Sequence, residues 1–350
     1  MRGSERRGFV LVVVLWYLVA MALATALVVY WVRDRISDAQ ADRAGHLDRA
    51  AVISNRDTLL FIAATVPMTR AGQPLEPEPE ADLLQRRLDD FGGFDSSPRG
   101  DELRLDGHTY AGLGSFAVAI QDEAGLLNLA APTGPWLNVL FEDAGVPRAR
   151  RAALFASLQD YIDADDLRRF NGAESSVYER EGRAAPEGRP LIAPGEIGRI
   201  HGWADLDPAT LARLEEALTA VYVGPLNVNT APSSLLKAIL QDCRAVCVAR
   251  LEAIGGRAFA TAGDAELALA ARLPGDRDIN FRTSPSDQWR LTLQPAEGRP
   301  WRIHVRLTPM ADRAAPWTVD AAYRVPRPAD DDDPEPIPSP LFAPSAMAGR

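Results

Sequence analysis

The sequence predicts an α+β protein in which a long N-terminal membrane-spanning helix precedes an antiparallel sheet, and a large all-α domain is inserted into that sheet. Three observations carry this prediction: an apolar run over residues 9–32, apolar residues with a period of two on both sides of residues 126–274, and a helical, alanine-rich pattern within that range. Strand signals that flank a helical block favour one interrupted sheet over two consecutive domains.

The N-terminal helix is predicted from its length and its flanks. Residues 9–32 are apolar except for Thr25, and a helix of that length covers about 36 Å, enough to cross a hydrocarbon core of about 30 Å. A secretory h-region is shorter, about 7 to 15 residues, and ends at a small-residue cleavage site, which this run lacks. Residues 33–66 are polar but favour helix up to Pro67, so they are expected to extend the helix beyond the membrane.

Basic residues set the expected orientation of this helix. Arg2, Arg6 and Arg7 precede the apolar run, and cytoplasmic flanks of membrane spans carry an excess of such residues. The N-terminus is therefore expected in the cytoplasm, and the bulk of the chain on the other side of the membrane.

The sheet is predicted from two groups of strands, in residues 67–125 and 275–325. In the first group Phe116, Val118 and Ile120 alternate with alanines, but a lone hairpin there would be marginally stable. The second group supplies three strands, around residues 289–293, 301–307 and 318–324. Together, and packed on the long helix, the two groups form a stable layer.

Residues 126–274 are predicted to form the inserted helical domain. Its candidate helices cover residues 135–144, 147–164, 193–200, 208–220, 232–241, 245–254 and 263–272, and a further short helix is expected earlier, at residues 83–91. Residues 326–350 are rich in proline and contain a run of aspartates, which predicts a disordered acidic tail.

Composition disfavours several classes of function. The formal net charge of −10 argues against nucleic acid and anionic lipid as partners. The four histidines are isolated in the sequence, and it contains no HExxH, G-x-S-x-G or phosphate-loop motif, so an enzyme is not expected. These histidines are His46, His108, His201 and His304.

The densest polar cluster lies in "DYIDADDLRRFNGAESSVY". It contains Asp160, Asp163, Asp165, Asp166, Asn171 and Glu174. Carboxylates this close repel one another unless a cation neutralises them, and oxygen ligands at loop spacing, with Gly172 to bend the chain, suit calcium better than zinc. The alternative is a solvated acidic helix end that Arg168 and Arg169 partly balance.

The two cysteines, Cys243 and Cys247, leave two readings open. On one continuous helix a disulfide between them would be strained, whereas a turn between two helices at residues 242–245 would make it feasible. Two buried thiols are the other reading.

The segment "LNVNTAPSSLLKAI" (226–239) also has two readings. Thr230 or Asn229 is expected to cap a helix that starts near Pro232. The alternative is a DNA-binding helix-hairpin-helix, but this element needs glycines whose amides approach phosphate, and the next segment, "QDCRAVCVARL", has none.

The start of the chain resembles a type IV prepilin leader. In "RRGFVLVVVLW", Gly8 stands immediately before Phe9, where the apolar run begins. Leaders of this class, here residues 1–8, are cut before the apolar helix, between Gly8 and Phe9, so the helix stays as the anchor. Most pilins have glutamate as the fifth mature residue. Here it is Val13, and this departure is typical of the K-type minor pseudopilins of type II secretion systems.

Four internal motifs resemble the same family and follow its order. They are "DEAGLLNLA" (122–130), "YIDADDLRRFNGAESSVY" (161–178), "PLIAPGEIGRIHGW" (190–203) and "LNVNTAPSSLLKAIL" (226–240). The resemblance implies a pilin-like body, with the long helix on the antiparallel sheet, and a large inserted helical domain. It also implies a structural calcium ion held by Asp163, Asp165, Asp166 and Glu174.

The resemblance implies a function and partners as well. The chain would be a non-enzymatic minor pseudopilin at the tip of a periplasmic pseudopilus, anchored in the inner membrane, that helps to initiate assembly and to export folded proteins. Its partners would be other minor pseudopilins, prepilin peptidase, the inner-membrane secretion machinery and secreted substrates, without nucleic acid, and Phe9 would be methylated after cleavage. The alternative is a minor pilin of a type IV pilus or a membrane-anchored DNA-uptake protein.

Overall fold

The computed structural model describes residues 6–77, 96–131, 134–310, 315–327, 336–339 and 341–342. The chain divides into two compact units, Met1–Ile53 and Ser54–Arg350. The short helix expected at residues 83–91 lies outside the described residues. The boundaries expected between the sheet body and the inserted domain stay predictions.

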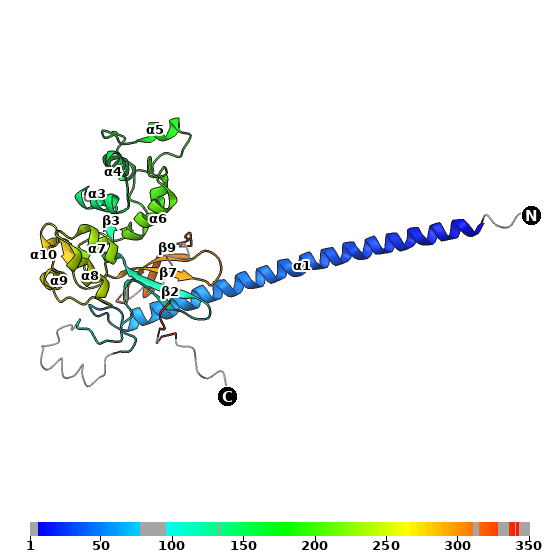
Figure 1. The fold of residues 1–350 in the computed structure, drawn as a ribbon, viewed down its shortest axis with the longest axis horizontal. Helices are drawn as coiled ribbons and strands as arrows, with labels where there is room; N and C mark the ends of the chain where they lie inside the picture. Colours follow the sequence, from blue (N-terminus) through cyan, green and yellow to red (C-terminus); the bar gives the residue numbers. More distant parts are fainter. Residues whose placement is uncertain are drawn as a thin grey trace, which may run out of the picture. The chain divides into compact units, whose positions relative to one another are not determined.

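The N-terminal helix α1 (Arg6–Thr65) is continuous through the predicted transmembrane and extramembrane parts (Figure 1). Among the described residues, α1 is the one helix that is long and apolar enough to cross a membrane. The Thr25 hydroxyl donates to the Met21 carbonyl at 2.8 Å, so this polar group is satisfied within the apolar run. The helix ends just before Pro67, as predicted, because proline disfavours helical backbone in the preceding residue.

The central sheet has five strands in the order β1-β2-β7-β8-β9, and every neighbouring pair is antiparallel. These strands are β1 (Asp106–Ala111), β2 (Ala117–Asp122), β7 (Gln288–Gln294), β8 (Trp301–Leu307) and β9 (Trp317–Arg324). Ile120 pairs with Leu291, and Leu291 pairs with Ile303, so buried apolar residues cross the sheet side by side. The prediction of one interrupted antiparallel sheet is confirmed, because β2 pairs directly with β7.

The last turns of α1 lie in the second compact unit and pack on the hairpin of β1 and β2. Leu59 and Leu60 are buried there. The Asn55 side-chain oxygen accepts a hydrogen bond at 2.7 Å from the backbone N–H of Leu113, in the loop between these strands. The apolar and polar contacts together fix the end of the helix beside the sheet (Figure 1).

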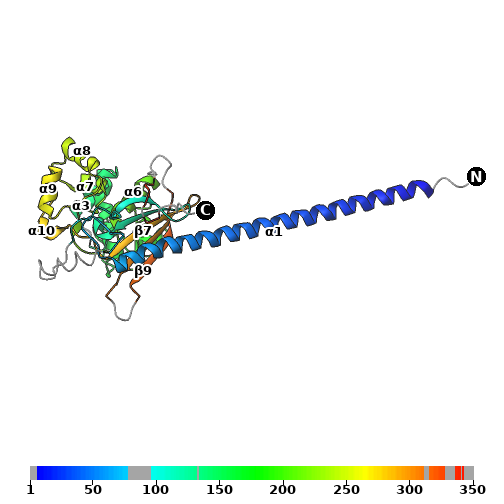
Figure 2. The same ribbon diagram turned by 90° about the horizontal axis from the view of Figure 1, so that it is seen from below.

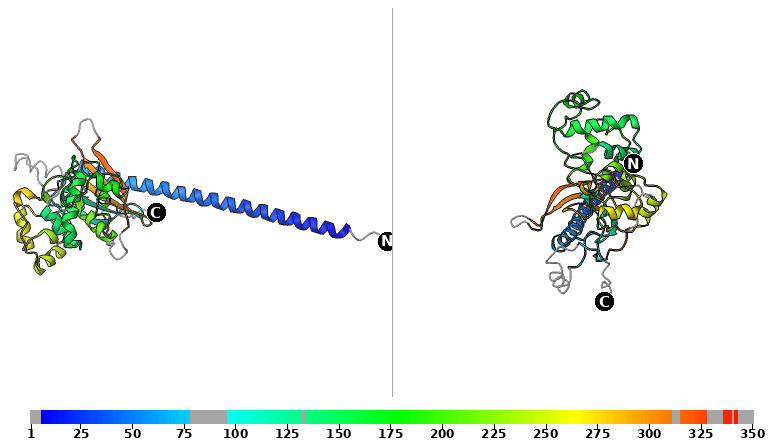
Figure 3. Two further views of the ribbon diagram at one scale, coloured as in Figure 1. Left: turned by 90° about the horizontal axis from the view of Figure 1, so that it is seen from above. Right: turned by 90° about the vertical axis from the view of Figure 1, so that its left-hand side faces the viewer.

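The segment between β2 and β7 is mainly helical, as predicted. It contains η1 (Glu123–Gly125), α3 (Gly134–Asp143), α4 (Arg148–Ile162), α5 (Ser175–Arg180), η2 (Pro194–Arg199), α6 (Pro208–Ala217), α7 (Ser233–Ile239), α8 (Ala245–Ala253), α9 (Ala262–Leu269) and α10 (Arg277–Asn280). Figure 2 shows α8, α9 and α10 grouped beside α7, and both views in Figure 3 show this segment (green to yellow) next to the C-terminal strands (orange).

Several short elements of this segment differ from the prediction. The segment also contains two-residue strands that pair in parallel, β3 (Leu127–Asn128) with β4 (Leu218–Thr219) and β5 (Leu226–Asn227) with β6 (Phe281–Arg282). Helices α5 and α10 are new, and the expected helix at residues 193–200 is the 3-10 helix η2. Elements of two to six residues are too short to show a hydrophobic period, so the sequence pattern missed them.

One hydrophobic cluster holds the helical segment together. Its centre includes Trp203, which is fully buried, lies edge-on to Phe141 with ring centroids 5.2 Å apart, and donates from Nε1 to the Leu154 carbonyl at 2.9 Å. The indole thus combines a large apolar contact with a satisfied polar group, which is the way a tryptophan is best buried.

The C-terminal tail was predicted to be disordered, and part of it is not. Among its described residues, Ile337 forms a parallel bridge with Tyr110 of β1, and its carbonyl accepts from Ala111 N at 2.8 Å. Phe342 is buried as well. Because β1 is an end strand of the sheet, its outer backbone groups are open to pairing, and composition alone does not reveal such a partner.

Asp122 joins the sheet to the helical segment. It stands at the end of β2 and has no exposed surface. Its carboxylate accepts from Asn227 Nδ2 at 2.9 Å, Thr230 Oγ1 at 2.8 Å and Ser286 Oγ at 2.6 Å. It also accepts from the backbone N–H of Ala124 at 3.1 Å. One buried side chain therefore connects three chain segments: the end of β2, residues 227–230 and Ser286.

The helix-capping prediction for residues 226–239 was wrong. Helix α7 begins at Ser233 without a side-chain cap. Thr230 bonds instead to Asp122, and Asn229 bonds to the backbone of Phe259, at 2.9 Å from its N–H to Asn229 Oδ1. These polar side chains serve tertiary contacts, which local sequence cannot distinguish from capping.

His304 was predicted to be isolated, yet it lies in a buried chain of polar groups. Its Nδ1 is 2.5 Å from Glu123 Oε1 and its Nε2 is 3.0 Å from the Tyr323 hydroxyl. Burial acts to raise the pKa of Glu123, but the hydrogen bond and charge of His304 outweigh it and hold that pKa below its ordinary value. Glu123 and His304 have no exposed surface, so these two side chains are closed off from solvent.

Candidate metal centre

The acidic residues of the predicted site meet where helix α4 ends. Asp160 lies in the last turn of α4 and Asp163 is its C-terminal cap. Residues three apart on a helix share a face, so the two carboxylates point the same way. The chain then turns back through Asn171, which has a positive φ of 63°, and brings Glu174 to the same place.

Gly172 allows this return because it passes directly over a carboxylate. A Cβ atom at this position would lie 2.0 Å from Asp160 Oδ2, closer than any side chain permits. Gly172 was expected to bend the chain here. Its role is more specific, because only glycine lets the loop approach Asp160 so closely.

The spacing of the carboxylates fits one calcium ion. One oxygen each of Asp160, Asp163 and Glu174 lies within 4.8 Å of the others. Calcium binds oxygens at about 2.3–2.6 Å, so two ligand oxygens of one ion can be at most about 5 Å apart. The three side chains can thus reach a common ion without rebuilding the loop.

All four predicted ligands line one cavity of about 250 Å³, but they are not equivalent. Asp163 and Glu174 belong to the close group. Asp165 and Asp166 line the cavity wall, and Asp165 Oδ1 accepts from the backbone N–H of Leu167 at 2.9 Å. Asp160 completes the close group and was not among the predicted ligands. Its position three residues before Asp163 on a helix was the signal that could have identified it.

The electrostatics of the cavity also favour a cation. Glu174 is only 4% exposed, and burial together with the surrounding aspartates raises its pKa to about 7. Within the described part of the chain, Glu174 Oε1 and Asp163 Oδ1 are buried without a hydrogen-bond partner. Unpaired buried carboxylate oxygens are costly, and a hard cation with oxygen ligands would satisfy them. The residues therefore fit calcium.

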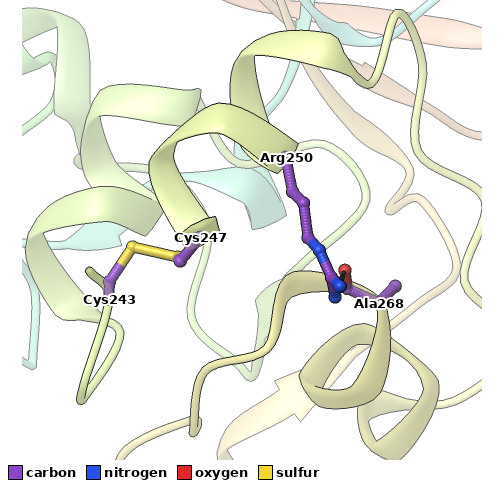
Figure 4. The surroundings of a disulfide bond; sticks show 4 residues. All are labelled: Cys243, Cys247, Arg250 and Ala268. Carbon is purple, nitrogen blue, oxygen red and sulfur yellow. Dashed lines mark hydrogen bonds between the residues drawn. A yellow bond between two sulfur atoms is a disulfide. The ribbon is translucent and has the colours of Figure 1, made fainter. Parts of the chain in front are cut away.

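The other predicted site residues lie elsewhere in the chain. The backbone of Gly8 and Phe9 belongs to the first turns of α1, and the cleavage between them stays a prediction. Cys243 and Cys247 are joined in a disulfide whose Cα atoms are 5.1 Å apart. Cys243 lies in the turn between α7 and α8 and Cys247 on α8, which is the arrangement that makes such a bridge feasible (Figure 4).

The disulfide stands beside a second contact that anchors α8. Arg250, on the same helix, donates from Nη1 to the Ala268 carbonyl at 2.8 Å and to the Leu267 carbonyl at 3.2 Å, near the end of α9 (Figure 4). The start of α8 is therefore tied to the preceding turn and its last turn to α9.

Removal of the disulfide is expected to destabilise the protein moderately. The bridge closes a short loop, for which the chain-entropy estimate is about 2 kcal/mol. Changing both Cys243 and Cys247 to Ser should lower the free energy of unfolding by that amount in chemical denaturation of the detergent-solubilised chain. Dithiothreitol should destabilise the unmodified chain and leave the double variant unchanged. Equal stability of the reduced and oxidised chains would contradict this expectation.

Comparison with known proteins found one family model and a similar solved structure. Residues 122–223, which include the acidic cavity, match the family model of type II secretion system protein K, first domain. No curated protein matches the sequence. The fold is similar to a chain in the crystal structure of the GspK–GspI–GspJ complex of the type 2 secretion system from enterotoxigenic Escherichia coli, with 17% sequence identity, a TM-score of 0.51, and coverage of 83% of this chain and 99% of that chain. Three of the four motifs noted in the sequence lie in the matched range, so the match supports the resemblance there: residues 122–223 are similar to a domain of type II secretion system protein K.

Proposed function

We propose that the chain is a minor pseudopilin at the tip of the periplasmic pseudopilus of a type II secretion system, where it helps to initiate assembly and to export folded proteins. The observation that carries this proposal is the match of residues 122–223 to protein K. This range begins at the end of β2 and precedes β7 in the sequence, in a chain that starts with a long apolar helix. Such a chain has an apolar anchor and a bulky body, which supports a structural role.

The proposed partners are other minor pseudopilins. The structural relative was solved as a complex of GspK, GspI and GspJ. Val13 supports the tip position, because a chain without the usual acidic residue cannot pair with the N-terminus of a further subunit. A valine in lipid also avoids the cost of an unpaired carboxylate there. The inner-membrane secretion machinery and the secreted substrates are proposed as further partners.

The proposed location is the inner membrane, crossed once, with the N-terminus in the cytoplasm and the body in the periplasm. Three arginines, Arg2, Arg6 and Arg7, precede the span, which favours a cytoplasmic N-terminus. The bond between Cys243 and Cys247 supports a periplasmic body, because disulfides persist in oxidising compartments.

Processing of the leader tests the class of protein directly. A prepilin peptidase is expected to cut after Gly8, so mass spectrometry of the protein extracted from membranes should find Phe9, in methylated form, as the first residue. The physical reason is the small residue before the apolar run. Gly8→Leu should retain residues 1–8, whereas Gly3→Leu, the matched control, should be processed normally. An intact leader on the unmodified chain would contradict the proposal.

We also propose that the acidic cavity binds a structural calcium ion. Asp160, Asp163 and Glu174 would supply the closest oxygens, and Asp165 and Asp166 would line the rest of the cavity. The support is the spacing of the three carboxylates and the two unpaired buried oxygens described above. The ion would neutralise the cluster and fix the returning loop to the end of α4.

A further inference from the structure

We propose that Arg169 is the internal counter-cation of the acidic cavity, and that calcium must displace its guanidinium from the carboxylates in order to bind. This inference rests on the proposed calcium site and names the residue that sets its affinity. Arg169 lies in the loop that leaves α4, between the aspartates and Glu174.

The guanidinium of Arg169 bridges two of the three closest carboxylates. Its Nη1 donates to Asp160 Oδ1 at 2.8 Å and also to Asp163 Oδ2. The backbone N–H of the same residue contacts both oxygens of Asp160, at 3.3 and 3.2 Å. The side chain and the backbone of Arg169 together therefore donate hydrogen bonds to both oxygens of Asp160.

Calcium and this guanidinium compete for the same two carboxylates. Both carry positive charge, and Asp160 and Asp163, whose carboxylates accept from Nη1, are candidate ligands of the ion. A double and a single positive charge about 5 Å apart in water repel each other strongly enough to change a binding constant roughly tenfold. The inward guanidinium therefore weakens binding of the ion, and the bound ion favours the outward position of the guanidinium.

The position of Arg169 lets it leave without unfolding the site. Its side chain is 40% exposed, whereas that of Asp160 has no exposed surface. The guanidinium can turn into solvent when the ion arrives, while its backbone N–H remains on Asp160. In the absence of metal it returns and neutralises the aspartates, so the loop keeps its folded form in both states.

The chain offers a matched control in the adjacent residue. Arg168 has the same charge and is exposed, while the described ion pairs of Asp160 and Asp163 go to Arg169. Arg168→Gln and Arg169→Gln change the net charge equally, but only the second removes the bridge. A difference between the two variants therefore reports the contact and not the overall charge.

The experiment measures calcium binding to the full chain in detergent by isothermal titration calorimetry, for the unmodified protein and both variants. Arg169→Gln is expected to bind calcium about tenfold more tightly, and Arg168→Gln within about twofold of the unmodified chain, since an exposed charge is screened. In EGTA, Arg169→Gln should melt at a lower temperature than Arg168→Gln.

The possible outcomes separate this inference from the calcium proposal. Equal calcium affinities of the two variants would overturn the role of Arg169 and leave the metal site standing. An absence of calcium binding in all three proteins would overturn the metal site and the competition. The melting temperatures in EGTA would then still test whether Arg169 neutralises the aspartates. If Arg169→Gln melts at the same temperature as Arg168→Gln, Arg169 does not have this role.

Discussion

Asp122→Ala is expected to lower the free energy of unfolding by about 3–5 kcal/mol, because it leaves several buried donors without an acceptor. The carboxylate receives hydrogen bonds from Asn227, Thr230 and Ser286, which lie in two segments far from Asp122 in the sequence. Its removal also leaves the backbone N–H of Ala124 unpaired at the start of η1. Urea denaturation of the detergent-solubilised chain, followed by tryptophan fluorescence, measures the loss.

A nearby exposed aspartate provides the control. Asp287 is exposed, and its replacement by alanine should change stability by less than about 0.5 kcal/mol, as for most surface positions. Asp122→Asn keeps the shape but puts an amide donor opposite hydroxyl and N–H donors, so it should be nearly as damaging as alanine. If Asp122→Ala were no more destabilising than Asp287→Ala, Asp122 would not be a stabilising junction.

The regular parts of the fold could be predicted because their signals repeat along the chain. Residues 9–32 are long enough to cross a membrane, Pro67 marks where the helix ends, and the alternation around Val118 returns in the C-terminal strands. The apolar run and the alternation each extend over at least five residues, Pro67 is a strong signal by itself, and all three require only local sequence. The pairing of β2 with β7 then follows from the order of the segments.

The missed features depend on contacts between distant residues. Thr230 has the chemistry of a helix cap, but a buried carboxylate 108 residues away takes its hydroxyl. Ile337 lies in a proline-rich acidic tail, yet the end strand β1 accepts it as a neighbour. Asp160 belongs to the acidic cluster, and its spacing to Asp163 was a signal in the sequence, but only the fold shows that the turn at Gly172 brings Glu174 beside it.

Calcium is expected to raise the melting temperature of the full chain in detergent by several degrees relative to EGTA. An ion that binds only the folded state adds about 2.7 kcal/mol at a hundredfold excess over its dissociation constant. Asp163→Asn together with Glu174→Gln should abolish most of this difference, because the variant loses two of the three closest carboxylates. Glu297→Gln, at an exposed position, should retain it. Magnesium should substitute poorly, since it requires stricter octahedral geometry.

The rise in melting temperature that calcium causes should also depend on pH. The pKa of Glu174 in the folded chain, about 7, lies above its ordinary value of 4.5, so without metal the folded state holds a proton that the unfolded state releases. The stability that this proton contributes is fully present below about pH 4.5 and is lost as the pH rises through about 7. Calcium requires the ionised carboxylate, so the rise in melting temperature should be larger at pH 8 than at pH 6. If adding EGTA to calcium-loaded protein at pH 8 left the melting temperature unchanged, the cluster would be a solvated acidic helix end balanced by arginine and not a calcium site.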